Sequence, residues 1–439
     1  MRSSALALLL LPALLLAAIP ARAQEAVQET AEGAPLVDME WGGHLMGLGS
    51  LTFPPGRTSM DSLDGSPLTD GLLELRLLNK TFLGDSAYVD VHYEARLQGG
   101  ETRSRGKELA RRYPWLHPDG LVTPEDDDRR LMDLSWTAWK DDGTVLSHRL
   151  DRLCLTLVPD WGEIRLGRQA LTWGNGLVFN PLDLFNPFAP TDTVRDYKLG
   201  DDMALVQFQA GDAGIQLIYT PHRDPRDGAG DWEQASLGGK AHFSVGETEI
   251  DLLAAKHYED EIVGAGLRGY AGDAAWRLDA SWTFLEERNR GRDGYLSLAA
   301  NLDYSWNWLG KNWYGFVEIY HNGLSNGEPT ESLADPVLSE RLARGELHTL
   351  GSLYGAAHVE VEVHPLVTLL FTGINNLGDG STTLLPGLRW SLSDNLELRA
   401  SGAVFLGDRE TEYGGFEVPG TGFESRPSDS FSTRLTWYF

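Results

Sequence analysis

Hydrophobic and polar residues alternate along most of this chain with a period of two, as in a β-strand with one apolar and one polar face. The alternation is clearest in segments 88–97, 274–284 and 296–308, where aliphatic and aromatic residues alternate with charged and amide side chains. Weaker alternation marks further segments, at 39–50, 71–79, 131–139, 146–158, 162–170, 202–210, 214–221, 236–245, 248–257, 261–270, 312–321, 351–363, 366–374, 383–392, 395–406 and 430–439.

The last of these segments gives the pattern a direction. It has an apolar face that ends in Leu435, Trp437 and Phe439, and a polar face that includes Arg434. Such a strand suits a wall between lipid and water. The ending resembles the recognition strand of bacterial outer-membrane barrels, whose final aromatic residue is read by the assembly machinery. The resemblance implies that Trp437 and Phe439 are the assembly signal, with that machinery, outer-membrane lipid and lipopolysaccharide as partners.

Charged residues on one strand face and apolar residues on the other fit a barrel with a lipid-facing outside and a polar lumen. We therefore predict an all-β fold, a transmembrane antiparallel β-barrel of about 18 strands, with 16 or 20 as alternatives. Trp306, Trp313 and Trp437 lie toward strand ends, as in the aromatic girdles of such barrels. The alternating segments number nineteen, and closed bacterial barrels have an even number. One strand before about 130 is therefore missed or counted in excess.

Loop lengths test the same model, because these barrels have short turns on the periplasmic side and longer loops outside. Counted back from Phe439, the two kinds of connection alternate. Segment 98–128 breaks the alternation, because it is long and charged but falls on the periplasmic side. The outer loops are 407–429, 323–346, 286–293, 222–232 and 173–200, and the inner turns are 393–395, 364–365, 309–312, 246–247 and 159–162.

The amino-terminal segment has the features of a secretory signal peptide. Met1-Arg2 is followed by an apolar run over 5–19 and by the small-x-small sequence Ala21-Arg22-Ala23. We predict a signal peptide at 1–23, a flexible polar lead-in at 24–37 and the outer-membrane barrel at 38–439.

Composition excludes several other classes. The net charge of −27 argues against nucleic-acid binding, which needs Lys and Arg for phosphate contacts. Cys154 is the single cysteine, so no intrachain disulfide can form. The His residues are scattered, and no cysteine-rich or haem motif is present. We expect no metal and no cofactor.

The stretch 165–190 is the most distinctive part of the chain. It contains two Asn-Pro turns and is too apolar for a freely solvated outer loop. Its side chains either pack inside the barrel or cover the mouth, and an inward-folded loop is how porins narrow their channels. The residues expected to pack are Trp173, Phe179, Phe185 and Phe188.

Together with 148–153, this stretch resembles an uncharacterised group of porin-like outer-membrane proteins that carry a Gly-Arg-Gln…Trp-Gly motif. The distinctive match is confined to these residues, while the barrel pattern covers the whole expected mature chain. The resemblance implies a barrel and supplies no known substrate.

Polar residues of this region either form a charged constriction or hold the loop, or they form a structural ion-pair network in the wall. On a regular strand Arg165 and Arg168 face opposite sides. A bulge near Gly167, or emergence of Arg168 above the bilayer, would resolve this. The candidates are Arg149, Asp151, Arg152, Arg165, Arg168 and Gln169.

Catalytic signals are weak. The sequence 264–269 matches G-x-G-x-x-G but lies in a strand pattern with no helix after it. His92, His242 and His257 could each lie near a carboxylate, but nothing singles out a nucleophile with its base. We predict that the protein is not an enzyme.

The sequence therefore predicts a bacterial outer-membrane, porin-like channel for passive passage of small hydrophilic solutes or ions. The alternative is a non-catalytic binding or assembly barrel, with a surface polysaccharide or an electron-transfer cytochrome as partner. The oligomeric state, including a homo-oligomer, stays open.

Overall fold

The computed structural model describes residues 37–56, 66–112, 126–185, 187, 197–224, 228–230, 232–418 and 423–439. The predicted signal peptide 1–23, the predicted lead-in up to residue 36 and Phe188 lie outside these residues.

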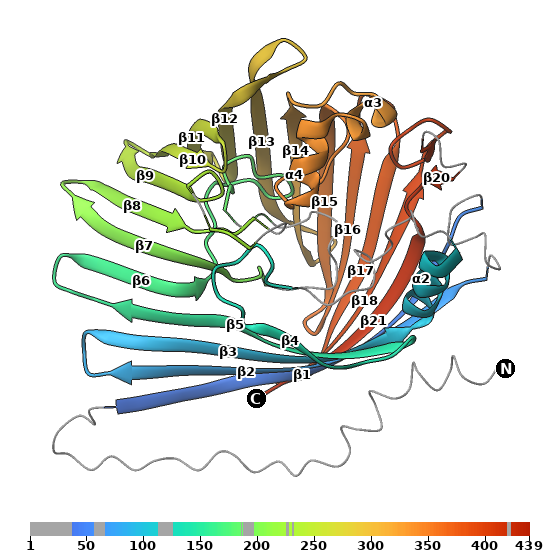
Figure 1. Cartoon of the computed structure of the whole chain (residues 1–439), viewed down its shortest axis with the longest axis horizontal. Coiled ribbons are helices and arrows are strands. Elements are labelled where there is room, and N and C mark those ends of the chain that lie inside the picture. Colours follow the sequence, from blue (N-terminus) through green and yellow to red (C-terminus); the bar gives the residue numbers. More distant parts are fainter. Residues whose placement is uncertain are drawn as a thin grey trace.

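One antiparallel sheet curls round and closes on itself as a barrel, because β1 pairs with both β2 and β21 (Figure 1). Its strands are β1 (Val37–Phe53), β2 (Leu68–Leu83), β3 (Ala87–Gly100), β4 (Ser135–Lys140), β5 (Thr144–Leu157), β6 (Gly162–Gln169), β7 (Asp201–Ala210), β8 (Ala213–Thr220), β9 (Ser236–Val245), β10 (Thr248–His257), β11 (Asp260–Ala271), β12 (Ala274–Asn289), β13 (Arg292–Trp308), β14 (Lys311–Asn322), β15 (Leu353–His364), β16 (Val367–Asn376), β17 (Thr382–Ser393), β18 (Leu396–Leu406) and β21 (Asp429–Tyr438).

Eighteen of these strands form the closed wall, which confirms the predicted number. The exception is β4, which among the described residues pairs only with the first half of β5. The second half of that edge of β5 pairs with β6, and its opposite edge pairs with β3. The alternating segment at 131–139 is therefore the one counted in excess. It lies just after residue 130, slightly later than predicted.

Removing β4 from the wall also repairs the alternation of loops and turns. The whole connection from β3 to β5, including helix α2 (Glu101–Arg112), now lies at the barrel end that carries the long loops. The prediction that segment 98–128 falls on the side of the short turns was wrong, because it counted β4 as a crossing. We call the two ends of the barrel the loop end and the turn end.

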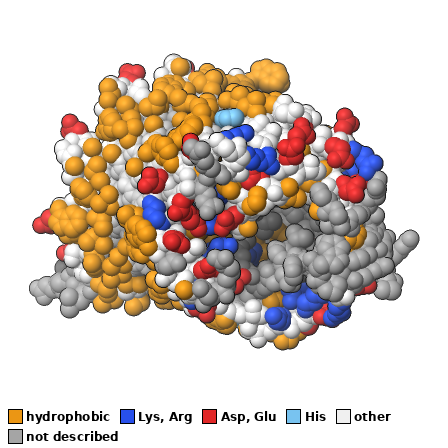
Figure 2. Space-filling model, turned by 45° about the horizontal axis from the view of Figure 1, so that its top comes forward, with side chains coloured by type: hydrophobic (Ala, Val, Ile, Leu, Met, Phe, Trp, Pro, Cys, Tyr) orange, Lys and Arg blue, Asp and Glu red, His pale blue; other side chains and the backbone are white. Residues whose placement is uncertain are grey.

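The outer surface is apolar and the inner surface polar. Val317 and Leu302 are 57% and 44% exposed, whereas the inward-facing Asp279 and Glu318 are buried. Figure 2 shows hydrophobic side chains gathered over a broad part of the surface. A closed barrel with such an exterior faces lipid. Among the described residues, no helix is long and apolar enough to cross a membrane.

Part of the loop end is covered by the connection between β14 and β15, which carries α3 (Pro329–Leu333) and α4 (Pro336–Ala343) (Figure 1). Arg341 pairs with Asp260, and Arg344 lies 3.2 Å from the Glu259 carboxylate in the turn between β10 and β11. The short hairpin of β19 (Phe416–Glu417) and β20 (Glu424–Ser425) lies in the last loop.

Candidate functional site

The connection from β6 to β7 enters the barrel and packs against its inner wall. Trp173, Leu182 and Phe185 are buried together with wall residues that include Met203 and Ile218. The indole Nε1 of Trp173 also donates a 2.8 Å hydrogen bond to Gln216. We call residues 171–185 the inward loop, since of the two predicted arrangements, packing inside the barrel or covering its mouth, the structure shows the first.

Glycines on the inner face of the wall make room for this loop. A Cβ atom at Gly238 would lie 2.8 Å from the ring of Phe185, and one at Gly264 would lie 2.7 Å from a methyl group of Leu182. Gly266 likewise faces the inward loop, where a Cβ would lie 2.9 Å from the Asn175 amide nitrogen. The sequence G-x-G-x-x-G therefore reflects close approach of a loop to a strand.

Two buried carboxylates bind the backbone of the inward loop. Glu318 on β14 accepts N–H hydrogen bonds from residues 177, 178 and 179, at 2.8, 3.2 and 2.7 Å. Asp279 on β12 accepts from the Asn175 backbone and, at 3.0 Å, from its side-chain amide. Asn301 donates to Glu318 at 3.1 Å. Neither acid was predicted from the sequence. The only sign of them there is that each carboxylate occupies a position that faces the lumen.

Phe179 packs the inward loop against β14 and β15. Its ring stacks on Tyr320 at 4.5 Å with an interplanar angle of 11°, and lies 5.4 Å from the ring of Tyr354. Trp173, Phe179 and Phe185, the three predicted packing residues that the structure describes, are all buried.

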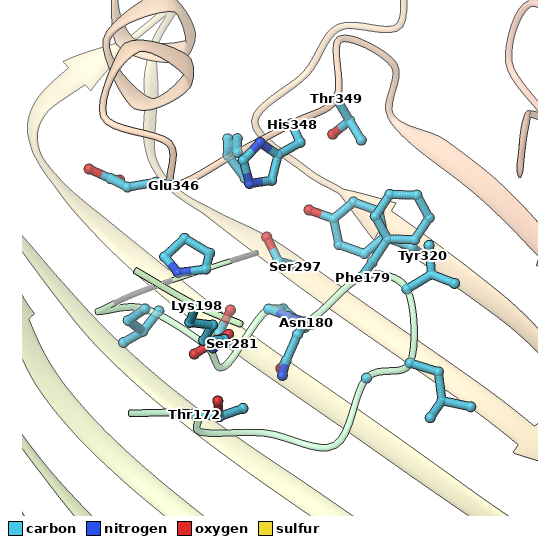
Figure 3. Close-up of a pocket in the computed structure, with 18 of the residues that line it drawn as sticks. Thr172, Phe179, Asn180, Lys198, Ser281, Ser297, Tyr320, Glu346, His348 and Thr349 are labelled. Atoms are coloured by element: carbon cyan, nitrogen blue, oxygen red, sulfur yellow. The ribbon is translucent and has the colours of Figure 1, made fainter. Parts of the chain in front are cut away.

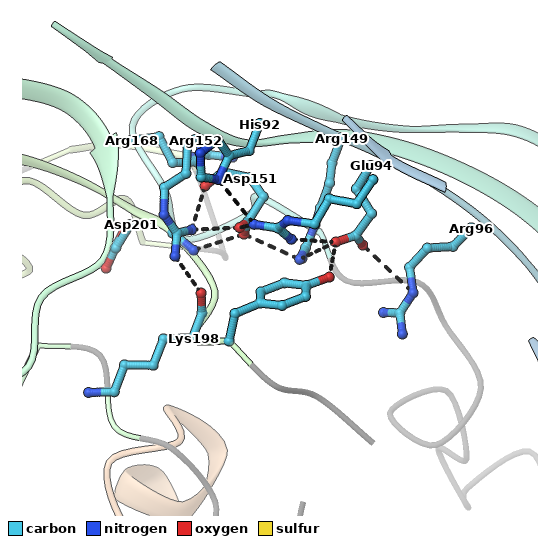
Figure 4. Close-up of polar contacts among 12 residues, drawn as sticks. His92, Glu94, Arg96, Arg149, Asp151, Arg152, Arg168, Lys198 and Asp201 are labelled. Atoms are coloured by element: carbon cyan, nitrogen blue, oxygen red, sulfur yellow. Dashed lines mark hydrogen bonds and ion pairs between the residues drawn. The ribbon is translucent and has the colours of Figure 1, made fainter. Parts of the chain in front are cut away.

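A charged cluster on β2, β3 and β5 lies on another part of the wall (Figure 4). Arg76 lies 2.5 Å from Asp151 and 3.1 Å from Glu94. Arg149 bridges the same two acids at 3.2 and 3.3 Å, and Arg152 lies 2.6 Å from Asp151. We call these five residues the arginine cluster. Their mutual pairing compensates the charges inside the wall.

The arginine cluster binds the returning limb of the same connection. Arg152 donates to the Lys198 carbonyl at 2.7 Å, and the Gly200 N–H donates to Asp151 at 3.0 Å. The guanidinium of Arg76 lies 3.5 Å from the centre of the Tyr197 ring. The cluster is therefore an ion-pair network in the wall that also holds the returning limb, while a role in a charged constriction stays a prediction.

A β-bulge gives the arginine cluster its geometry. The register between β3 and β5 shifts after His92, and Asp151 is the extra residue on β5. The bulge brings Arg149 and Arg152 to the same acid, Asp151, although they are three positions apart. The bulge considered near Gly167 is not where the shift lies, because the register of β6 with both neighbours runs unshifted.

The remaining predicted polar residues lie elsewhere. Arg165 pairs with Glu163 on its own strand. Arg168 lies 2.9 Å from Asp202 and 2.7 Å from Asp127, and thus ties the segment before β4 to the strand ends. Burial opposes ionisation of Asp127, but Arg168 outweighs it and lowers the pKa of that carboxyl. The last candidate, Gln169, donates from its side-chain amide to a backbone carbonyl on β7 at 3.1 Å.

The inward loop separates two cavities. The loop-end cavity, of about 500 Å³, lies between the inward loop and the segment 346–349 (Figure 3). The turn-end cavity, of about 820 Å³, is bounded by the turn between β5 and β6 and by β7 to β11, and Thr172 lines both. A third cavity of about 320 Å³ is lined by Arg76, Arg96, Arg152 and Arg434.

An ion pair joins the two limbs of the connection. Lys198 pairs with Asp183, and both side chains line the loop-end cavity. Burial raises the pKa of Asp183 to about 6, although Lys198 acts in the opposite direction.

The histidines considered for catalysis have structural contacts. His242 lies 3.0 Å from Asp251, and His92 lies 3.3 Å from an Arg76 nitrogen. The Nδ1 atom of His257 lies 2.9 Å from the hydroxyl of Ser236, which is fully buried and does not line a described cavity. His257 itself lines the loop-end cavity, but the Ser236 hydroxyl does not reach a described cavity and so is not placed as a nucleophile.

Comparisons with known proteins show which solved structures share this fold. No protein-family model and no curated protein sequence matches the chain. OccAB1 of Acinetobacter baumannii superimposes with a TM-score of 0.53 at 9% identity, over 91% of this chain and 96% of its own. A BenF-like porin from Pseudomonas fluorescens Pf-5 and OccK8 (OprE) of Pseudomonas aeruginosa both reach 0.51, at 10% and 9% identity, over 92% of this chain and 98% of theirs.

The chain has the fold of the outer-membrane porins. At these identities the likeness concerns the fold alone, so the contacts of the inward loop carry any argument about function.

Proposed function

We propose that this chain, a bacterial outer-membrane barrel, is a porin-like channel for passive passage of small hydrophilic solutes or ions, and that it acts without catalysis. The observation that carries the proposal is the inward loop, fixed to β12 and β14 by carboxylates while its returning limb is fixed to β5 by the arginine cluster. It narrows a polar lumen and leaves water-accessible cavities on both sides.

The closing strand supports the proposed partners, which are the barrel-assembly machinery, outer-membrane lipid and lipopolysaccharide. Phe439 exchanges backbone hydrogen bonds of 3.0 and 3.1 Å with Gly43 at the seam of the barrel. Its side chain is 51% exposed, and its ring lies 5.2 Å from that of Trp437. Both rings are thus available at the turn end for a recognition partner.

The alternative of a sheath around an electron-transfer protein conflicts with the inward loop. The described residues of this loop cross the lumen from Gln216 on β8 to Glu318 on β14, where an enclosed partner would have to lie. The anchors are buried and hydrogen-bonded, so displacing the loop would leave several buried polar groups without partners.

Planar-bilayer recording tests the proposal. Purified full-length protein is expected to give discrete conductance steps when it inserts into the membrane. Insertion is checked separately by heat-modifiable migration on gels. Folded, inserted protein that gives no steps would overturn the proposed function.

A further inference from the structure

The loop-end cavity has the size and enclosure of a binding site. It is bounded by the inward loop on one side and by the residues that follow α4 on the other. Figure 3 shows Glu346, His348 and Thr349 across the cavity from Thr172 and Asn180. Its volume of about 500 Å³ falls within the range of small-molecule sites, roughly 300–1,000 Å³.

The lining is rich in hydroxyl groups and carries little unbalanced charge. Ser281, Thr283 and Ser297 contribute hydroxyls from β12 and β13. Among the described lining residues, the acids have cationic neighbours. Asp183 pairs with Lys198, and Glu346 has a guanidinium nitrogen at 3.6 Å. Such a lining favours a solute that is polar but uncharged.

Two buried atoms in this cavity lack a hydrogen-bond partner among the described residues. They are Nε2 of His257 and Oε1 of Glu346, which lie 3.9 Å apart. The other ring nitrogen of His257 is 2.9 Å from Ser236, whose hydroxyl also accepts from the Tyr258 backbone N–H. The Glu346 carboxylate, 3.9 Å from Nε2, favours the neutral tautomer that carries its proton on Nε2, and in that tautomer the Ser236 hydroxyl donates to Nδ1.

A hydroxyl group is the chemistry that completes this pair. One hydroxyl oxygen about 2.8 Å from each atom can accept from the Nε2–H of His257 and donate to Glu346. A carboxylate has no proton to donate to Glu346, and an ammonium group cannot accept from the imidazole. The neighbouring serine and threonine hydroxyls can both donate to and accept from further hydroxyls of the same solute.

We propose that the loop-end cavity is a binding subsite for uncharged polyhydroxylated solutes of mono- to disaccharide size, with His257 and Glu346 holding one hydroxyl. This inference rests on the proposed function and names the class of solute that the channel selects. The subsite lies at the loop end, ahead of the constriction for a solute that enters from that side.

Bilayer recordings with sucrose as the probe test the subsite. We expect sucrose to cause a saturable block of the wild-type current, distinct from the linear effect of viscosity. Glu346→Gln, which keeps the shape and loses the charge, is expected to raise the half-blocking concentration about tenfold. Gluconate, a charged solute of similar hydroxyl content, is expected to block the wild type less. Glu362→Gln, at a lumen carboxylate outside this cavity near the turn end, is the matched control and is expected to retain the block.

The outcomes separate the subsite from the channel. Absence of conductance in folded wild-type protein would refute the channel, and calorimetric titration of the detergent-solubilised protein with sucrose would still test the subsite. Conducting protein without a saturable block, or with the same block in Glu346→Gln and wild type, would overturn the subsite. If Glu346→Gln does not fold, Ser281→Ala removes a lining hydroxyl and is expected to weaken the block several-fold; an unchanged block would overturn the subsite equally.

Discussion

Glu318 is the single side chain on which docking of the inward loop depends most. Its carboxylate accepts three backbone N–H groups of the loop and one side-chain amide, and it is 5% exposed. Glu318→Ala leaves these donors without their acceptor inside the barrel. Each such loss costs about 1–3 kcal/mol, and partial access of water to a widened lumen offsets some of it. We expect the docked state to lose roughly 3–5 kcal/mol relative to the released state.

That loss corresponds to a change of roughly 10²- to 10⁴-fold in the ratio of docked to released loop. Released loops would open the constriction, so single-channel recordings of Glu318→Ala should show larger and noisier conductance. Heat-modifiable migration should remain, because the strands do not need the loop to pair. Glu362→Gln is the matched control, since its carboxylate has a single 2.8 Å contact with Asn312 on the neighbouring strand. A folded Glu318→Ala channel with wild-type conductance and noise would refute the assignment of Glu318 as the anchor.

Three further predictions follow from other parts of the site. Gly264→Val should also release the inward loop, because a Cβ atom at this position lies 2.7 Å from a Leu182 methyl group. Cleavage by trypsin after Lys198 should then increase, while Gly239→Val, at a position that faces outward, should be cleaved like wild type. Arg76→Ala leaves Glu94 and Asp151 short of a buried partner and should cost about 3–5 kcal/mol, seen as a lower unfolding temperature on gels, whereas Arg268→Ala at an exposed pair should change it little. The pKa of Asp183 is raised to about 6 from its ordinary 3.8, so the contribution of Asp183 to loop docking is present below about pH 4 and is lost as the pH rises through 6. Current noise should therefore fall when the pH is lowered from 7 to 5, and the same pH response in Asp183→Asn would contradict this.

The barrel could be predicted from the sequence because its determinant is local. Lipid outside and water inside impose a period of two on every strand, and each strand shows it within about ten residues. The exception was β4, which has the same alternation as a wall strand. Trp136 and Trp139 are both 50% exposed, and every residue of β4 after Ser135 is exposed, so the alternation in its sequence does not correspond to two faces of a wall.

The inward loop could be predicted in part for the same reason. Its apolar residues contradict a solvated loop, which pointed to Trp173, Phe179 and Phe185 as packing residues. The anchors could not be predicted, because Glu318 and Asp279 lie 139 and 104 positions from the backbone groups they bind. A carboxylate on a lumen face looks the same in sequence whether it meets water or a loop, and only closure of the barrel brings these segments together.

The arginine cluster could also be predicted only in part, but here the wall residues were found and their partners were not. Its β5 residues were singled out from the sequence, yet their partners Arg76 and Glu94 belong to strands that only the barrel places beside them. The bulge at Asp151 also cannot be read from alternation, because an extra residue simply interrupts the pattern there. Loop-binding residues in such barrels are therefore better sought where alternation fails. A glycine or a bulged acid on a lumen face marks a place where the wall accommodates another segment of the chain.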